Sequence, residues 1–277
     1  MQPDSKAIER ILHAALEEDI GQGDITSELV IPETEQIRVA FVTREGIVVC
    51  GLSVLERLFA MLEGVRLQAA AKEGEVLAAG GIIARAEGNA RIILKAERVA
   101  LNLLQRMCAI ATQSRRYAEA VQGTGATVLD TRKTTPGLRV IEKYAVATGG
   151  CTNHRMRLDD GILIKDNHVH LCGGVKQAVE RAKRNYKGNL PIHLECDTLA
   201  QVEEALAAGT PHILLDNMDI PTLKQAVDFV KGRAKLEASG GVTIKNIRAI
   251  AETGVDFISV GALTHSVPAV DIGLDVE

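Results

Sequence analysis

From residue 126 onward, short apolar runs alternate regularly with helical patterns. The strand-like runs are TVLDTR, GILIKD, IHLECD, HILLDN, KLEASG and FISVGA. The last four begin about 20 residues apart, which is the size of one β/α repeat. Apolar strands that alternate with helices form a parallel sheet. Because six repeats are visible, the pattern predicts an incomplete (β/α) barrel, with an open doubly wound sheet as the structural alternative.

The preceding part of the chain has a different pattern. A first helix is expected from the spacing of apolar residues at 8–16, and a loop follows at GQGD. Strand-like runs then occur at IRVAFVT, GIVVCG, VRLQAAA, GGIIARAEG and ARIIL, with one short helix at SVLERLFAML. Runs bounded by glycines and charged turns predict an antiparallel sheet. This part therefore reads as a small α+β domain that ends near Leu94.

A long helix is expected from Glu97 to Val121, with apolar residues over most of its surface. Such a helix packs on more than one side, so it is expected to link the two domains. A narrow polar stripe on it comprises Arg98, Asn102, Gln105, Thr112 and Arg116. The stripe is either a thin solvent-exposed edge or one wall of a polar site.

Composition excludes several classes of function. The chain carries a net charge of −4 and has no Trp, three Tyr and four Phe, which argues against a nucleic-acid-binding face. Its five cysteines include no C-x-x-C pair, so neither a disulfide framework nor a structural zinc site is expected. The N-terminus lacks the apolar core of a signal peptide, and no apolar run reaches the length of a membrane span. The expected location is the cytoplasm.

Positive charge is concentrated in one segment of this acidic chain. Residues 131–168 contain Arg132, Lys133, Arg139, Lys143, His154, Arg155, Arg157, Lys165 and His168. Because several of these residues adjoin apolar strand-like runs, they predict a pocket for a small, multiply charged anion. Arg132, Lys133, His154, Arg155 and Lys165 are expected to point into it. Arg139, Lys143 and Arg157 are expected at the surface of a helix or loop, or at an interface.

Acidic and small residues also stand at the predicted strand ends, where β/α folds build their sites. Glu195 and Asp216 are candidates for binding Mg²⁺ or sugar hydroxyls and for stabilising an oxocarbenium ion. The pair Asp197 and Thr198, by contrast, precedes a predicted helix and is expected to cap it, so Asp197 is not kept as a site residue. The small-residue loops at 239–243 and 260–264 follow the last two strands, and such loops often bind phosphate. A lysine in a strand has another known use as a Schiff-base nucleophile, so an aldolase based on Lys165 stays open.

Several long motifs resemble one family over nearly the whole chain. They are EEDIGQGDITS at 17–27, AERVALNLLQRMCAIAT at 96–112, DTRKTTPGLRVIEKYAVATGG at 130–150, NHRMRLDDGILIKDNHV at 153–169, LLDN at 214–217, EASGG at 237–241 and VGALTHSVPAVDIGLD at 260–275. These motifs are similar to those of quinolinate phosphoribosyltransferases, also called nicotinate-nucleotide pyrophosphorylases (carboxylating). The resemblance implies a small N-terminal α/β sandwich over 1–107, joined by the tail 266–277, and an incomplete (β/α) barrel of about six to seven strands over 108–265.

The resemblance also implies a role for each matching residue. Quinolinate would be bound by Arg132, His154, Arg155 and Lys165, and by Arg98 of a second subunit. Lys133 and Lys165 would approach phosphoribosyl pyrophosphate, and Glu195 and Asp216 would face its ribose and Mg²⁺. Phosphate would be held by Ser239, Gly240, Gly241 and Gly261, with His265 nearby. The catalytic set would be Lys133, Lys165, Glu195 and Asp216.

The implied reaction transfers a phosphoribosyl group to quinolinate with loss of CO₂, giving nicotinate mononucleotide and pyrophosphate in NAD biosynthesis. The implied assembly is a homodimer with shared active sites, and a hexamer stays open. Alternatives are a same-fold paralogue of the molybdenum-transport-associated type with another acceptor, the Schiff-base aldolase, and a non-catalytic phosphometabolite sensor. A sensor would not need the pair Glu195 and Asp216.

Overall fold

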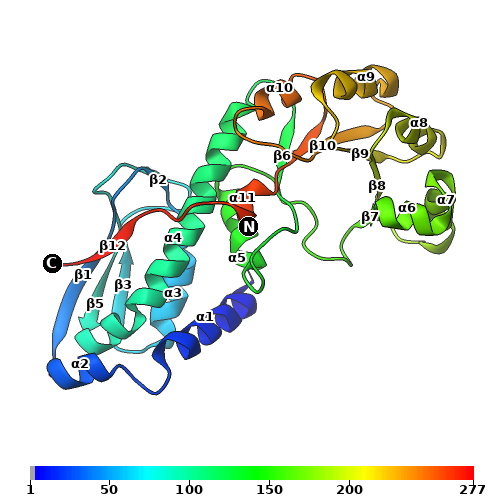
Figure 1. Ribbon diagram of the computed structural model, residues 1–277. Coiled ribbons are helices and arrows are strands. Elements are labelled where there is room, and N and C mark those ends of the chain that lie inside the picture. The colour runs from blue at the N-terminus through cyan, green and yellow to red at the C-terminus, as the bar shows by residue number, and fades with distance from the viewer. Residues whose placement is uncertain (1–3) are drawn as a thin grey trace. The chain divides into compact units, whose positions relative to one another are not determined.

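The computed structural model describes residues 4–277. They fall into two units. The first comprises Met1–Arg115, Thr134–Gly150 and Leu263–Glu277, and the second comprises Arg116–Lys133 and Cys151–Ala262. The long helix α4 (Ala90–Ala120) contributes residues to both units (Figure 1). No helix among the described residues is both long and apolar enough to cross a membrane.

The first unit is built on an antiparallel sheet, as the sequence predicted. Its four strands lie in the order β12 (Ile272–Val276), β1 (Gln36–Thr43), β5 (Ile82–Asn89) and β3 (Val65–Ala69). β12 brings the C-terminal tail alongside β1 (Figure 1). A two-stranded ribbon joins β2 (Ile47–Val48) and β4 (Val76–Leu77). The helices are α1 (Ser5–Ile20), α2 (Ile25–Val30) and α3 (Leu52–Met61), and the ring of Phe59 on α3 packs edge-on against Phe41 of β1.

The start of α4 corrects one prediction. The run ARIIL was expected as a strand that ends the domain near Leu94, but these residues form the first turns of the helix. Asn89 ends β5 and accepts a hydrogen bond from the backbone N–H of Ile92 through its side chain, which begins the helix. Ile93 is fully buried. Its packing therefore outweighs the modest preference of β-branched residues for strands.

The polar stripe on α4 bonds in part to the backbone of its own unit. Gln105 donates to the carbonyl of Ile272, and Thr112 accepts from the N–H of Val48, each at 2.8 Å. These two side chains therefore tie the helix to β12 and β2. Arg98 and Asn102 remain exposed.

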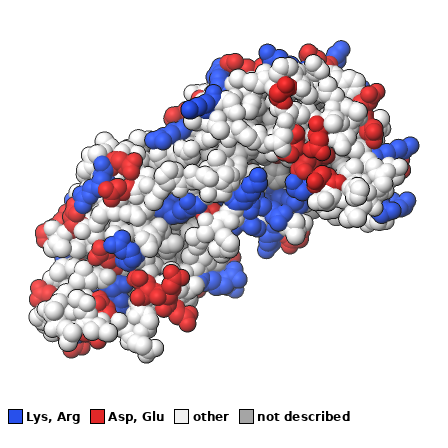
Figure 2. All heavy atoms as spheres, viewed as in Figure 1, with Lys and Arg blue, Asp and Glu red and all other residues white. Residues whose placement is uncertain are grey.

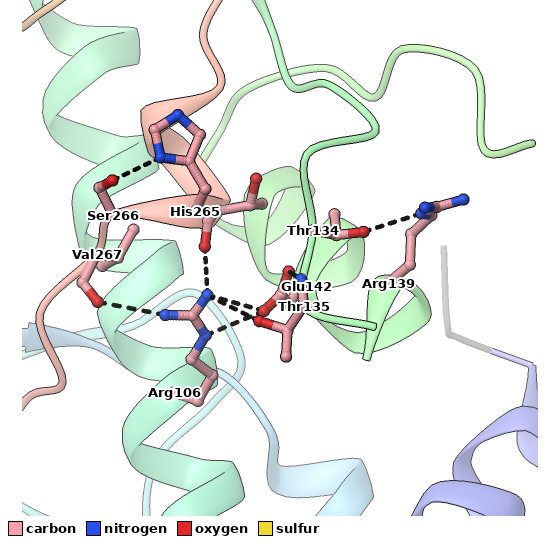
Figure 3. Close-up of polar contacts among 9 residues, drawn as sticks. Arg106, Thr134, Thr135, Arg139, Glu142, His265, Ser266 and Val267 are labelled. Atoms are coloured by element: carbon pink, nitrogen blue, oxygen red, sulfur yellow. Dashed lines mark hydrogen bonds and ion pairs between the residues drawn. The ribbon is translucent and has the colours of Figure 1, made fainter. Parts of the chain in front are cut away.

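A buried ion pair braces the first unit where three segments meet (Figure 3). Glu142 on α5 (Arg139–Thr148) is fully buried, and Arg106 of α4 donates to it at 2.8 Å. Arg106 also donates to the carbonyl of Thr264 in α11 (Ala262–His265) and to that of Val267 in the C-terminal tail. The second oxygen of Glu142 accepts from the N–H of Thr135. One guanidinium and one carboxylate thus hold α4, α5 and the tail together.

The second unit contains a six-stranded parallel sheet, as the alternating pattern predicted. The order is β6 (Thr127–Leu129), β11 (Phe257–Ser259), β10 (Lys235–Ser239), β9 (His212–Asp216), β8 (Ile192–Cys196) and β7 (Ile162–Ile164). Strands consecutive in sequence from β7 to β11 are neighbours, and β6 then follows β11. A doubly wound sheet would reverse its strand order. The open-sheet alternative is therefore wrong, and the sheet is a barrel wound in one direction and open between β6 and β7.

Helices connect these strands, as a parallel sheet requires. They are α6 (Asp166–Cys172), α7 (Val175–Asn185), α8 (Leu199–Ala207), α9 (Ile220–Val230) and α10 (Ile247–Ala251), and α11 (Ala262–His265) follows β11. The helix cap that was predicted at residues 197–198 is confirmed at the start of α8. The N-cap is Thr198, whose side chain accepts a hydrogen bond from the N–H of Gln201.

Candidate active site

A cavity of about 540 Å³ lies at the carboxyl ends of the parallel strands, wholly within the second unit. Its lining comprises Thr131, Arg132, Lys133, His154, Arg155, Leu163, Lys165, Glu195, Leu214, Asp216, Asn217, Glu237, Ser239, Gly240, Gly241 and Ser259. Ten of the residues that the sequence proposed for the site are in this set. They come from segments that are far apart in the sequence, and the sheet brings them together because parallel strands end at the same edge.

Three proposed residues do not line the cavity. Arg98 is exposed on α4 and belongs to the first unit. His265 is exposed at the end of α11, where its ring bonds to the hydroxyl of Ser266, and it also belongs to the first unit (Figure 3). Gly261 lies in the second unit, directly before α11.

The basic side of the cavity is formed by residues 132–133, 154–155 and 165. Arg155 is held by a hydrogen bond from its Nη1 to the carbonyl of Gly161 at 2.8 Å. Burial, and then the neighbouring charge of Arg132, lower the pKa of Arg155. Two guanidiniums kept close in a partly desolvated site repel each other unless an anion lies between them. The arrangement therefore favours an anionic ligand. Figure 2 shows basic and acidic side chains next to each other over the second unit.

Among the remaining basic residues of the segment 131–168, the prediction of a surface position holds for Arg157 but is wrong for Lys143. Arg157 is at the surface as expected, with 71% of its side chain exposed in an ion pair with Asp159. Lys143 was expected at a surface or an interface, but it is fully buried in the first unit, on the inner side of α5. Arg139 donates to the hydroxyl of Thr134 at 2.9 Å (Figure 3).

The acidic side of the cavity comes from β8 and β9. Glu195 forms an ion pair with Lys165, and only 10% of its side chain is exposed. Asp216 ends β9 and lies in register with Ser239 on β10. Carboxylate oxygens on adjacent strand ends are hard ligands of the kind that Mg²⁺ prefers. The donor set of Glu195 and Asp216 therefore fits this ion, although binding through Glu195 requires Lys165 to release it or to share it.

A tight turn of backbone follows β9 and β10. Asn217 adopts a positive φ of 53°, donates its backbone N–H to the carbonyl of Ser239 at 2.8 Å, and donates its side-chain amide to Asp216 at 2.7 Å. Gly240 and Gly241 have φ of 95° and 60°. These conformations favour glycine, and they turn the chain sharply at the rim of the cavity. At Gly241 no atom lies within 4 Å of the position that a Cβ atom would take, so the backbone of the turn is open there, as phosphate sites require.

The floor of the cavity was missed from the sequence. Glu237 lies in the middle of β10 and is fully buried, and Ser259 of β11 donates to it. His212 of β9 contacts its other oxygen at 2.8 Å. A signal did exist, because a glutamate in the run KLEASG lies two positions before Ser239 and shares its face of the strand. Sequence alone could not say that His212 would be its neighbour.

His154, His193 and Glu237 place ligand atoms within 4.8 Å of one another, a spacing that could hold a metal ion. The hydrogen bonds oppose this reading. Nδ1 of His154 accepts from the N–H of Arg155 at 2.7 Å, so the ring proton is on Nε2, the atom that faces Glu237. A protonated nitrogen is not a metal ligand.

Comparison with known proteins gives a consistent result. Family models for the N-terminal and C-terminal domains of quinolinate phosphoribosyl transferase match residues 24–108 and 110–275. A probable nicotinate-nucleotide pyrophosphorylase [carboxylating] of Bacillus subtilis is 39% identical over 97% of this chain and 93% of its own length. Its counterpart from Synechocystis is 40% identical over 94% of this chain and 90% of its own length.

Solved structures agree with these relatives. The crystal structure of a nicotinate-nucleotide pyrophosphorylase from Ehrlichia chaffeensis superposes with a TM-score of 0.95 at 44% identity, covering 100% of both chains. The enzyme of that name from Francisella tularensis gives a TM-score of 0.95 at 35% identity, covering 100% of this chain and 98% of the other.

Proposed function

The chain belongs to the quinolinate phosphoribosyltransferase family, and from this premise we propose that its strand-end cavity transfers phosphoribose from phosphoribosyl pyrophosphate to quinolinate. The acceptor loses CO₂ in the same reaction, and the products are nicotinate mononucleotide and pyrophosphate. The observation that carries the proposal is that one cavity combines Arg132, Arg155 and Lys133 with the pair Glu195 and Asp216. The first group suits an anionic acceptor, and the second suits a sugar with its metal ion.

Quinolinate is a pyridine with two adjacent carboxylates. A guanidinium binds a carboxylate through two parallel hydrogen bonds, so Arg132 and Arg155 would hold this acceptor in one orientation. The lone pair of the ring nitrogen attacks without prior loss of a proton. No general base is therefore needed, which agrees with a cavity built mainly of cations.

The sugar step breaks the bond between the anomeric carbon and pyrophosphate and forms the bond to the ring nitrogen. Lys133 and Lys165 would neutralise charge that develops on the leaving pyrophosphate. Glu195 and Asp216 would stabilise the positive charge on the ribose ring. When bound, Mg²⁺ supplies further neutralisation of pyrophosphate charge. The turn at Ser239, Gly240 and Gly241 would hold the 5′-phosphate through its backbone N–H groups.

Decarboxylation completes the reaction. Attack leaves the ring as a pyridinium, and the bond to the adjacent carboxylate then breaks with its electron pair passing to the ring. The ring carbon takes up a proton and CO₂ departs. The relatives from Bacillus subtilis and Synechocystis have the word carboxylating in their names, and this word describes the reverse of the decarboxylation step.

The assembly belongs to the same proposal. We infer a homodimer in which Arg98 completes the cavity of a neighbouring subunit, and a cytoplasmic location. His265 would lie near the phosphate end. Arg98 is exposed on α4 rather than in a salt bridge within its own unit's core, so its guanidinium is accessible to a second chain. Gly261 would contribute backbone to the phosphate end.

One assay tests the proposal. Purified protein is mixed with phosphoribosyl pyrophosphate, Mg²⁺ and quinolinate that is labelled in the 2-carboxylate. The release of labelled CO₂ and the formation of unlabelled nicotinate mononucleotide are both measured. We expect both products in equal amounts, each dependent on both substrates. Consumption of phosphoribosyl pyrophosphate only with a different acceptor would favour the paralogue. Trapping of a carbonyl compound on Lys165 by borohydride would favour the aldolase.

A further inference from the structure

Glu237 is a buried carboxylate that the proposed reaction does not use. It has no exposed surface, and its contacts come from three segments. Ser259 donates to Oε1, Nε2 of His212 lies 2.8 Å from Oε2, and Nε2 of His154 lies 3.6 Å from Oε1. Burial by itself would raise the pKa of Glu237, but these contacts outweigh burial and hold that pKa well below its usual range. Glu237 is therefore a fixed negative charge beneath a cationic cavity.

His154 is fixed from two sides. The N–H of Arg155 donates to its Nδ1 at 2.7 Å, so the neutral ring carries its proton on Nε2. That proton faces Glu237 across a distance slightly longer than a hydrogen bond. The backbone N–H of His154 is also held by the carboxylate of Asp130 at 2.8 Å. Carboxylates often select the tautomer and orientation of a histidine in this way.

The contact continues to a residue of the quinolinate end. His154 accepts from the backbone of Arg155, and the guanidinium of Arg155 donates to the carbonyl of Gly161. Rotation of the His154 ring would release the Arg155 backbone. The carboxylate of Glu237 is therefore connected through one imidazole to a guanidinium at the cavity wall. The turn at Gly240 is not part of this chain of contacts.

Neighbouring histidines do not replace Glu237 in this role. His193 stacks on His212 with ring centroids 3.9 Å apart, and it meets His154 edge-on at 5.9 Å. Burial and then the nearby His212 lower the pKa of His193 to about 4, so it is neutral near pH 7. It packs against the ring of His154, whereas Glu237 places a carboxylate oxygen 3.6 Å from Nε2.

We propose that Glu237 is a positioning residue that holds His154 in its Nε2–H tautomer and, through His154, keeps Arg155 in place to bind the acceptor carboxylate. The role in acceptor binding rests on the proposed function, whereas the role in tautomer selection does not. Glu237→Gln tests both. The amide keeps the shape of the side chain but removes its negative charge. Its N–H₂ group must replace either Oε1, which faces both Ser259 and His154, or Oε2, which faces His212.

Two measurements are made on the intact protein. The first is the ¹⁵N–¹H correlation spectrum of the histidine rings, with the signal of His154 assigned by a His154→Gln variant among the seven histidines. The second is the KM for each substrate. We expect Glu237→Gln to lose the Nε2–H signature of His154 and to raise the KM for quinolinate by about tenfold or more. The KM for phosphoribosyl pyrophosphate should change by less than about twofold, because the hydrogen bonds that lead from Glu237 to Arg155 do not include the turn at Gly240.

Glu142→Gln is the matched control, because Glu142 is also a fully buried, ion-paired glutamate but lies in the first unit. It should leave the His154 spectrum as in the wild type. The proposal is overturned if Glu237→Gln folds with an unchanged His154 tautomer and an unchanged ratio of the two KM values. If that variant does not fold, the wild-type spectrum decides, since a proton on Nδ1 of His154 overturns the proposal. An inactive wild type with the expected tautomer would refute the reaction and not the positioning.

Discussion

The side-chain oxygen of Asn217 occupies the space in which any other residue at Gly240 would place its Cβ atom. The two residues follow adjacent strands, and Asn217 also donates its amide to Asp216. Two features therefore require glycine at position 240: its positive φ of 95°, and the side chain of Asn217, which leaves no room for a Cβ atom. The contact links the turn at the proposed phosphate end to a carboxylate at the proposed ribose end.

Gly240→Ala should displace Asn217 and with it Asp216. We expect the free energy of unfolding to fall by about 1–3 kcal/mol, and the KM for phosphoribosyl pyrophosphate to rise by about tenfold or more. Gly232→Ala is the control, since Gly232 has a φ of 74° but no atom within 4 Å of the position that a Cβ atom would take. It should lose stability without a change in KM. Equal KM values for the two variants would contradict the role of the Asn217 contact.

Arg155→Ala and Arg132→Ala should mainly impair the use of quinolinate. Each removes a partly buried cation that, on the proposed function, binds a carboxylate of quinolinate, so kcat/KM for quinolinate should fall by about 10²-fold or more. Arg157→Ala removes a neighbouring arginine whose side chain is 71% exposed, and we expect it to stay within about twofold of wild type. Steady-state kinetics at saturating phosphoribosyl pyrophosphate measure the effect. Wild-type kinetics for Arg155→Ala and Arg132→Ala would remove both from the acceptor site.

Glu195→Gln should reduce activity and weaken its dependence on Mg²⁺. The substitution keeps the volume of the side chain, releases Lys165 from its ion pair, and removes a negative charge from the proposed metal end of the cavity. We expect kcat/KM to fall by about 10²-fold and the Mg²⁺ concentration for half-maximal activity to rise. Asp197→Asn, two residues further along and exposed, should behave like wild type. An identical Mg²⁺ titration for both variants would place the metal elsewhere.

Acid should destabilise the second unit partly through His193. Its pKa is lowered to about 4 by burial and then by His212, so the unfolded chain takes up a proton at a pH at which the folded chain does not. The stability that this histidine contributes is therefore complete above about pH 6.5, and it is lost as the pH falls toward 4. His193→Asn should reduce the loss in free energy of unfolding between pH 7.5 and pH 5 by on the order of 1 kcal/mol. Urea denaturation at both pH values measures the free energy of unfolding. An equal loss of this free energy in the wild type and in His193→Asn would contradict the prediction.

Sequence reasoning found the residues that stand at strand ends, because the end of an apolar run is visible in one dimension. Arg132, Lys165 and Glu195 were identified in this way and line the same cavity. Glu237 was missed because its importance comes from neighbours on β9 and β11, which only the sheet order supplies. Lys143 was expected at a surface or an interface because charge usually stays in water, yet it is fully buried. The run ARIIL was misassigned because a short apolar run suits a strand and a packed helix equally well.

The last prediction concerns the proposed dimer. Arg98→Ala and Lys165→Ala should each be nearly inactive, because one removes a cation donated to the neighbouring cavity and the other removes a cation of the chain's own cavity. If sites are shared, mixed dimers contain one cavity that lacks both side chains and one that lacks neither. Random exchange at equal concentrations gives about half mixed dimers, so activity should return to about a quarter of wild type. Differently tagged subunits verify exchange, and Lys165→Ala mixed with Arg155→Ala is the control that should show no recovery, because both residues belong to one cavity. No recovery with Arg98→Ala, despite verified exchange, would mean that Arg98 acts within its own chain.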